Sequence, residues 1–223
     1  MVDDTASSRW REVVVAPLGL AGLLSVPERA RGLVVFAHGS GSSRLSRRNI
    51  AVAEHLQGAG LGTLLFDLLL PWEAGDERKM FDPVLLSERL AQALDWVAGE
   101  GEAQALPLGL FGASSGAAAA LLVAAGGHRA IGAIVARGGR PDLVLSALAH
   151  VRAPTLLLVG GADREVLELN RRALIRFGGP VTLEVIPGAR HLFGEPGALD
   201  AVAQRSADWF IRHLRAGGGE RRT

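Results

Sequence analysis

Residues 106–123 read Leu106-Pro-Leu-Gly-Leu-Phe-Gly-Ala-Ser-Ser-Gly-Ala-Ala-Ala-Ala-Leu-Leu-Val123. This stretch consists of an apolar run, then a serine flanked by glycines, and then an alanine-rich run. The aliphatic run over 106–111 is typical of a strand buried on both faces of a sheet. The next residues fit the pattern G-x-S-x-G, in which small flanking residues permit a sharp turn that lifts Ser114 above the sheet. The stretch therefore predicts a strand, a tight turn carrying Ser114 and a helix over 115–125.

Apolar runs separated by glycine or proline continue along the rest of the chain. Continuous apolar runs predict strands, and apolar residues three or four positions apart predict helices. The predicted strands cover residues 13–16, 20–26, 33–37, 63–66, 106–111, 130–136, 155–159 and 181–186, and the predicted helices cover residues 47–57, 83–97, 115–125, 142–150, 164–177 and 198–214. This order predicts an α/β fold, a mostly parallel sheet of about eight strands flanked by helices, with the first two strands as an antiparallel edge.

Length and composition favour one globular domain. The chain has 223 residues, of which 48% are hydrophobic and 21% are charged, and a chain of this length can bury a full-sized core. No Pro/Ser-rich linker and no internal repeat divides it. We therefore expect one domain over residues 10–215, a flexible N-terminus over residues 1–9 and a flexible tail over residues 216–223.

Composition also excludes several classes of function. The net charge of +1 offers no basic surface for nucleic acid. The absence of cysteine excludes disulfides, thiolate metal sites and a cysteine nucleophile. The first eight residues are polar and acidic, unlike a signal peptide, and no apolar run reaches the roughly 18 residues that a membrane span needs. We therefore expect a cytoplasmic protein with no metal, nucleic-acid or membrane partner.

Polar residues that follow the predicted strands are the candidates for chemistry, because ligands of an open α/β sheet bind beyond the carboxyl ends of its strands. Four segments qualify, residues 38–43, 112–116, 160–163 and 187–191. Ser114 lies at the centre of the second segment and is the predicted nucleophile. A serine hydroxyl needs a base to activate it and an acid to orient that base.

Two of these segments supply the predicted base and acid. His191 follows the last strand and is the predicted base, whereas His38 lies in a glycine-rich loop that better suits an oxyanion site. Asp163 directly follows a strand and is the predicted acid, although it could instead cap the next helix. Asp142 follows the preceding strand at a greater distance and is the alternative acid. The order Ser, Asp, His along the chain is that of the α/β-hydrolases.

An oxyanion formed at Ser114 needs hydrogen-bond donors close by. The backbone N–H of Ser115, next to the nucleophile, is one candidate. The N–H of Ser40, in the loop after the third strand, is the other, with that of Gly39 next. This Gly/Ser-rich loop could also cradle a phosphate, but the chain has neither glycine motif typical of nucleotide-binding loops. We therefore expect no nucleotide cofactor.

These segments together resemble the dienelactone-hydrolase-like branch of the α/β-hydrolases over roughly residues 10–215. The matching segments are His38-Gly-Ser-Gly-Ser-Ser-Arg44, Leu64-Leu-Phe-Asp67, Gly112-Ala-Ser-Ser-Gly116, Pro154-Thr-Leu-Leu-Leu-Val-Gly-Gly-Ala-Asp163 and Ile186-Pro-Gly-Ala-Arg-His191. The resemblance implies a triad of Ser114, Asp163 and His191 that hydrolyses carboxylic esters, thioesters or lactones without a cofactor. Related domains also occur joined to phosphoribosyltransferase domains.

One departure from the family affects the expected substrate. True dienelactone hydrolases use a cysteine nucleophile, which this chain lacks, so general esterase chemistry is expected instead of their reaction. Acyl transfer on the same triad is one alternative. A non-catalytic binding or scaffold role on a hydrolase fold is the other, and a broken triad would mark it.

The expected pocket is shallow and open. Fewer than 20 residues separate Val135 from Thr155, too few for a large cap domain. The predicted wall residues come from loops and are Gly39, Trp72, Met80, Phe81, Leu192 and Phe193. Trp72 and Phe81 could equally be packed under a loop without touching a substrate. So few apolar residues predict a compact small-molecule ester as the substrate.

Overall fold

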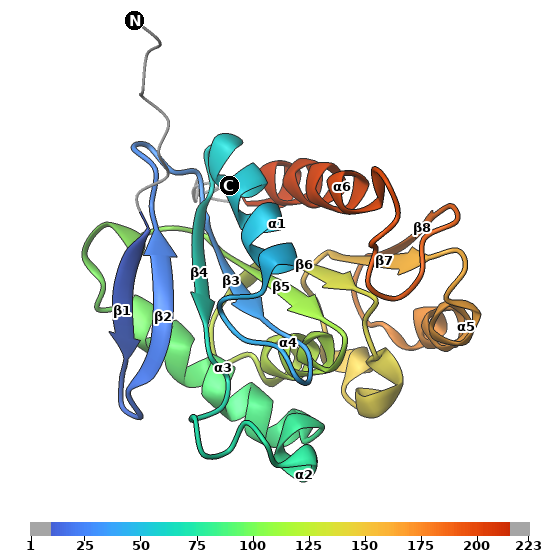
Figure 1. Ribbon diagram of the computed structural model, residues 1–223, viewed down its shortest axis with the longest axis horizontal. Coiled ribbons are helices and arrows are strands. Elements are labelled where there is room, and N and C mark those ends of the chain that lie inside the picture. The colour runs from blue at the N-terminus through green and yellow to red at the C-terminus, as the bar shows by residue number, and fades with distance from the viewer. Residues whose placement is uncertain (1–9, 215–223) are drawn as a thin grey trace, which may run out of the picture.

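The computed structural model describes residues 10–214, so the predicted flexible segments 1–9 and 216–223 lie outside the described residues. One sheet runs through the described part of the chain in the order β1-β2-β4-β3-β5-β6-β7-β8 (Figure 1). The strands are β1 (Arg11–Val15), β2 (Leu20–Ser25), β3 (Leu33–Ala37), β4 (Gly62–Phe66), β5 (Leu108–Ala113), β6 (Ile131–Arg137), β7 (Thr155–Gly160) and β8 (Val181–Ile186). The α-helices are α1 (Arg47–Gly58), α2 (Glu77–Met80), α3 (Pro83–Val97), α4 (Ser115–Gly126), α5 (Arg164–Ala173) and α6 (Ala198–His213).

The pairing of the strands confirms the predicted sheet. Strands β3 to β8 all run parallel, whereas β1 pairs antiparallel with β2 and β2 pairs antiparallel with β4. In the centre of the sheet, Val35 of β3 lies opposite Leu64 of β4 and Leu110 of β5. Every residue of β3 is buried, as expected of a parallel strand covered by helices on both faces.

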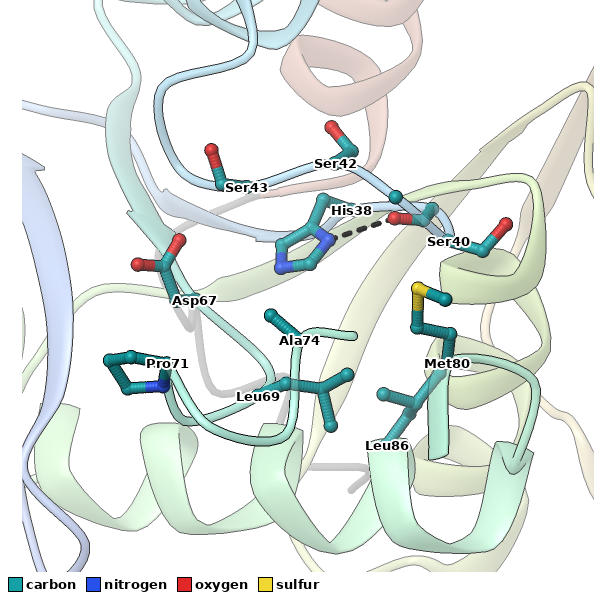
Figure 2. A pocket seen from close by; sticks show the side chains of 12 residues that line it. His38, Ser40, Ser42, Ser43, Asp67, Leu69, Pro71, Ala74, Met80 and Leu86 are labelled. Atoms are coloured by element: carbon teal, nitrogen blue, oxygen red, sulfur yellow. Dashed lines mark hydrogen bonds between the residues drawn. The ribbon is translucent and has the colours of Figure 1, made fainter. Parts of the chain in front are cut away.

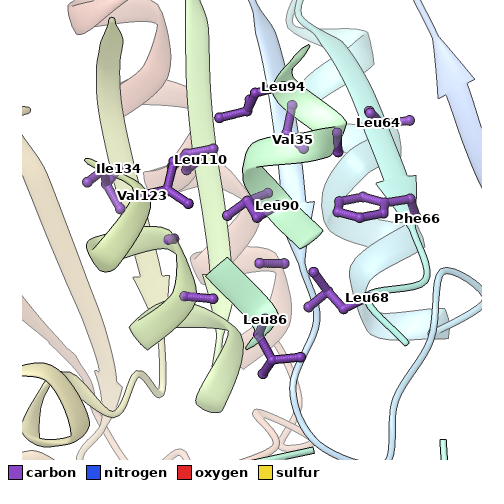
Figure 3. Close-up of a cluster of buried hydrophobic side chains, with 14 of the residues drawn as sticks. Val35, Leu64, Phe66, Leu68, Leu86, Leu90, Leu94, Leu110, Val123 and Ile134 are labelled. Carbon is purple, nitrogen blue, oxygen red and sulfur yellow. The ribbon is translucent and has the colours of Figure 1, made fainter. Parts of the chain in front are cut away.

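Two apolar cores lie on opposite faces of this sheet. Val35 belongs to the core beneath α3 and α4, where Leu90 of α3 packs beside Leu110 of β5 (Figure 3). Val34 belongs to the core beneath α1 and α6, which lie together on the other face (Figure 1). Because successive side chains of a strand point to opposite faces, one continuous apolar run serves both cores.

Two predicted helices differ from the structure. The structure replaces the helix predicted over 142–150 with two 3₁₀ turns, Pro141–Val144 and Leu148–His150, and it ends the helix predicted over 164–177 at Ala173. In these segments, apolar spacing indicates which side chains are buried, but it does not determine whether the backbone stays α-helical from one turn to the next.

The turn between β5 and α4 is packed directly against the end of β3. Ser114 occupies it with φ 51° and ψ −120°, a conformation that residues with a Cβ rarely adopt. A Cβ on Gly116 would lie well inside 3.0 Å of the carbonyl oxygens of Ala37 and His38, and one on Gly112 would lie similarly close to the backbone of Ala117. Glycine on both sides therefore permits the strained turn at Ser114.

Gly116→Ala should destabilise the protein strongly. The added methyl group must push α4 away from β3, because the obstructing atoms belong to the backbone, and we expect a loss of about 3 kcal/mol in the free energy of unfolding. Gly126→Ala in the same helix is the matched control, since a Cβ there meets nothing within 4 Å. Urea denaturation measures both variants, and equal stabilities would contradict the proposed close contact.

Candidate active site

Ser114, Asp163 and His191, which the sequence singled out, all lie at the carboxyl edge of the parallel strands. Ser114 follows β5, Asp163 follows β7 and His191 follows β8. The Nδ1 atom of His191 lies 2.7 Å from Oδ2 of Asp163. Because a carboxylate only accepts, Nδ1–H is the donor, and Nε2 of the neutral ring is left as an acceptor.

Asp163 also occupies the position before α5, where the sequence allowed a helix-capping role. Its side chain makes no capping hydrogen bond to that helix and binds His191 instead. The alternative acid, Asp142, accepts two hydrogen bonds of 2.8 Å from the guanidinium of Arg140. Of the two carboxylates, the one that contacts the histidine is therefore Asp163.

Ser114 lies between the loop that follows β3 and the loop that carries His191. A Cβ on Gly39 would lie 3.0 Å from Cβ of Ser114, so the first loop touches the serine directly. On the other side, the N–H of Ser114 donates to the carbonyl oxygen of Arg137. The next residue, Gly138, lies against the imidazole, since a Cβ there would be 3.3 Å from Cε1 of His191. The serine is partly exposed and so is open to a ligand.

The two predicted oxyanion residues contact each other. The backbone N–H of Ser40 donates to the hydroxyl oxygen of Ser115 at 3.1 Å. The Ser115 side chain is buried at the start of α4. This hydrogen bond directs the Ser40 N–H towards the turn that carries Ser114, although its acceptor here is a side-chain hydroxyl.

His38 joins two loops of the site, a role that sequence reasoning did not foresee. Its Nδ1–H donates to the carbonyl oxygen of Gly39 at 2.9 Å, and its Nε2 accepts from the N–H of Leu68 at 3.0 Å. Burial lowers the pKa of His38, although the hydrogen bond to Gly39 and the nearby Asp67 act in the opposite direction. The imidazole is therefore neutral and engaged at both nitrogens, which leaves it unsuited to act as a base.

A cavity of about 300 Å³ opens beside the loop that follows β3 (Figure 2). One side is formed by that loop and the other by apolar side chains of the segment 67–86. Its lining residues are His38, Gly39, Ser40, Gly41, Ser42, Ser43, Asp67, Leu69, Pro71, Ala74, Met80 and Leu86. Its size falls at the lower end of the range for small-molecule pockets.

Only some of the residues predicted to form the pocket wall line this cavity. Gly39 and Met80 do line it, but Trp72 and Phe81 do not, because their side chains face solvent with 78% and 53% exposure. Phe193 is 1% exposed and packs in the core beneath α1 and α6. Leu192 lies beside His191 in a separate, open hollow. Residue type alone does not reveal which way an apolar side chain in a loop points.

Glu73 anchors the segment that forms the apolar side of the cavity. Its buried carboxylate accepts from the N–H of Leu70 and from Nζ of Lys79, and Arg89 lies 3.5 Å away. Burial acts to raise the pKa of Glu73, but these hydrogen bonds and cations outweigh it and lower the pKa below its usual value. The segment is thus tied down by a carboxylate that stays charged at neutral pH.

Over residues 10–214, no group of three or more His, Asp or Glu side chains is placed to hold a metal ion. Within the same range, no helix is both long enough and apolar enough to cross a membrane.

A mostly parallel sheet of eight strands, with a serine turn after β5 and an Asp–His pair at the same edge, defines an α/β-hydrolase fold. Residues 21–215 match the family described as "Dienelactone hydrolase family". The chain belongs to the dienelactone hydrolase family, as the resemblance in its sequence predicts.

Solved structures share this architecture. Dienelactone hydrolase from Anabaena variabilis is 49% identical with a TM-score of 0.88, and the match covers 94% of this chain and 99% of that chain. Est1E from Butyrivibrio proteoclasticus is 17% identical with a TM-score of 0.76, over 91% of this chain and 98% of that chain. The second likeness shows the fold alone.

A curated relative is much longer than this chain. The Mycobacterium tuberculosis protein named "Putative phosphoribosyl transferase" is 55% identical over 203 residues, which are 91% of this chain but 46% of that protein. The chain thus spans less than half the length of this relative.

Acid should weaken the protein through His38. Because the pKa of His38 is lowered in the folded state, the unfolded chain binds more protons as the pH falls below about 6.5, the usual histidine value. The free energy of unfolding should then fall with pH, by at most about 1.4 kcal/mol per pH unit for this group. His38→Gln should flatten this dependence in urea denaturation, whereas the exposed His55→Gln should not. Parallel pH curves for wild type and His38→Gln would contradict the assignment.

Proposed function

We propose that this protein is a serine hydrolase that cleaves carboxylic esters, thioesters or lactones of compact substrates. The observation that carries the proposal is the 2.7 Å hydrogen bond between His191 and Asp163, at the strand edge that also holds the strained turn at Ser114. Such a turn presents a serine nucleophile in α/β-hydrolases. Membership of the dienelactone hydrolase family supports the same class of reaction.

In the proposed first half-reaction, Oγ of Ser114 attacks the carbonyl carbon of the ester while Nε2 of His191 removes the hydroxyl proton. The carboxylate of Asp163 orients the ring and stabilises the imidazolium that forms. The carbonyl oxygen becomes an oxyanion in the tetrahedral intermediate. When this intermediate collapses, the bond to the leaving oxygen breaks, and His191 passes its proton to the departing alcohol.

In the second half-reaction, water attacks the acyl-serine. His191 removes a proton from the water and then returns it to Oγ of Ser114 as the carboxylic acid leaves. The enzyme regains its starting protonation state, and no cofactor takes part in the cycle.

The N–H groups of Ser40 and Ser115 are the proposed donors to the oxyanion. The Ser40 N–H donates to the Ser115 hydroxyl in the free protein, so the oxyanion would replace that hydroxyl as the acceptor. The exchange favours the intermediate, because a hydrogen bond to a charged oxygen is roughly twice as strong as one between neutral groups.

The cavity suggests the size of the acyl group. It has a volume of about 300 Å³ and lies beside Gly39 and Ser40, next to the proposed oxyanion donors. Its apolar side is formed by Leu69, Met80 and Leu86. We assign this cavity to a short or compact acyl group, which leaves the leaving group on the open side near His191.

Ser114→Ala should abolish ester hydrolysis and covalent labelling by a fluorophosphonate. Without the hydroxyl no acyl-enzyme forms, so kcat for a p-nitrophenyl ester should fall by about 10⁴-fold or more. Intact-mass spectrometry should show one adduct on wild type and on the exposed control Ser146→Ala, but none on Ser114→Ala. An adduct that persists in the folded Ser114→Ala variant would refute the assigned nucleophile.

The value of kcat/KM should peak early in a series of p-nitrophenyl esters from acetate to palmitate. Each CH₂ that finds apolar surface adds about 0.8 kcal/mol, or about fourfold in rate, and this gain stops when the cavity is full. Met80→Ala should move the optimum to a longer chain. Phe81→Ala is the matched control and should leave the optimum unchanged, since Phe81 lies outside the cavity. A wild-type kcat/KM that still rises at an acyl chain of C10 would contradict the assignment of this cavity to a short acyl group.

A further inference from the structure

Two arginines near the turn at Ser114 have no counter-charge in the described part of the chain. Arg137 ends β6 and is 8% exposed, and its Nη1 is enclosed without a hydrogen-bond partner. Arg48 lies in the first turn of α1, and its Nε is likewise enclosed without a partner. Neither guanidinium forms an ion pair with a carboxylate of residues 10–214. Such groups are normally paired when they are buried.

The fold places both side chains in the same layer. Val135 of β6 belongs to the core beneath α1 and α6, and Arg137, two residues later, points to the same face because side chains alternate along a strand. Val52 of α1 belongs to this core too, and Arg48 lies one helical turn before it, on the same side of the helix. Helix α1 starts at the carboxyl edge of the sheet because it follows β3 (Figure 1).

The electrostatic environment of Arg137 agrees with the placement of Arg48 close to it. Burial, followed by repulsion from Arg48, lowers the pKa of Arg137 to about 10, so the guanidinium of Arg137 stays charged at neutral pH. Other carboxylates of this edge are already engaged, in the pairs Asp67–Arg44, Asp163–His191 and Glu195–Arg190. Two neighbouring cations, one of them nearly fully buried, are costly to keep together without a negative charge between them.

An open hollow at the start of α1 gives an anion access from solvent to Arg48. Arg48 also lines an open hollow of about 410 Å³ at the start of α1, together with Ser42, Ser43 and Ser46. The free N–H groups at the beginning of a helix carry partial positive charge and favour anions. The hollow therefore leads from solvent to one of the two guanidiniums through a polar lining.

We propose that Arg48 and Arg137 together bind one small oxoanion, a carboxylate or phosphate group, behind the turn that carries Ser114. Guanidinium groups match the geometry of such anions with two parallel N–H donors. The site lies beside the catalytic edge, since the Arg137 carbonyl accepts the Ser114 N–H. The oxoanion is therefore either a free ion or a negatively charged part of the substrate, and the second reading rests on the proposed hydrolase function.

Calorimetric titration with inorganic phosphate and with acetate tests the site without any turnover. Wild type should bind one ion of at least one of the two, and Arg137→Met and Arg48→Gln should each weaken this binding at least tenfold. Arg171→Gln removes an exposed charge from α5 and should change the affinity less than twofold. No saturable binding of either ion by wild type, or an equal loss in Arg171→Gln, would overturn the proposal.

Thermal unfolding in a buffer free of oxoanions gives a second readout. There Arg137→Met should raise the melting temperature, because an uncompensated buried charge is replaced by an apolar side chain of similar length. Phosphate or acetate, whichever binds, should then stabilise wild type and not this variant. An arginine with a merely structural role would give the opposite result, a lower melting temperature in Arg137→Met in every buffer.

Kinetics distinguish the two sources of the anion. If the substrate supplies it, monoethyl succinate should be hydrolysed with a kcat/KM at least tenfold above that of diethyl succinate, and Arg48→Gln should remove that preference. If a free ion supplies it, the two esters should react alike while the ion still raises the melting temperature. Anion binding and ester hydrolysis are measured separately. A protein that hydrolyses no ester would therefore contradict the hydrolase function but not the anion site. A protein that binds neither phosphate nor acetate would contradict the anion site but not the hydrolase function.

Discussion

The close contact between the start of α4 and the end of β3 is the constraint on which the rest of the site depends. Gly116 lies against the carbonyl oxygens of Ala37 and His38 with no room for a side chain. This contact forces the chain to reverse sharply at Ser114, which accepts a positive φ as a result. It also sets the loop after β3 beside the serine, so that the Ser40 N–H reaches Ser115. The nucleophile candidate and its neighbouring donors are therefore positioned by the backbone.

A second level of organisation joins the loops at the strand ends to one another. His38 connects the loop after β3 to the loop after β4 through the N–H of Leu68. Asp163 connects the loop after β7 to the loop after β8 through His191. Each connection uses an imidazole with a fixed tautomer, but the first is buried and the second is partly exposed. Burial therefore distinguishes the histidine that joins two loops inside the protein from the one whose ring remains accessible to solvent.

Much of this arrangement could be predicted because buried parallel strands leave a strong pattern of apolar runs ended by polar residues. The sheet, its antiparallel edge and the position of Ser114 follow from that pattern. Asp163 is the predicted partner of His191 and does contact it, but it stands where a helix cap is also expected, and only its side-chain direction distinguishes the two roles. Trp72 and Phe193 were misplaced for the same reason, since an apolar loop residue can face solvent or the core. The bond from His38 to Leu68 spans 30 residues and leaves no local pattern.

The origin of the cavity wall has a consequence for how such a protein diversifies. The apolar side of the cavity comes from the connection between β4 and α3 and from the first turn of α3, whereas Ser114, Asp163 and His191 follow β5, β7 and β8. Glu73 holds this connection in place by accepting hydrogen bonds from Leu70 and Lys79, which belong to the same connection. Under the proposed function, recognition and chemistry are thus encoded in separate stretches of the gene. Exchange of a single surface segment between homologues would then change the range of substrates and leave the residues of the proposed triad untouched.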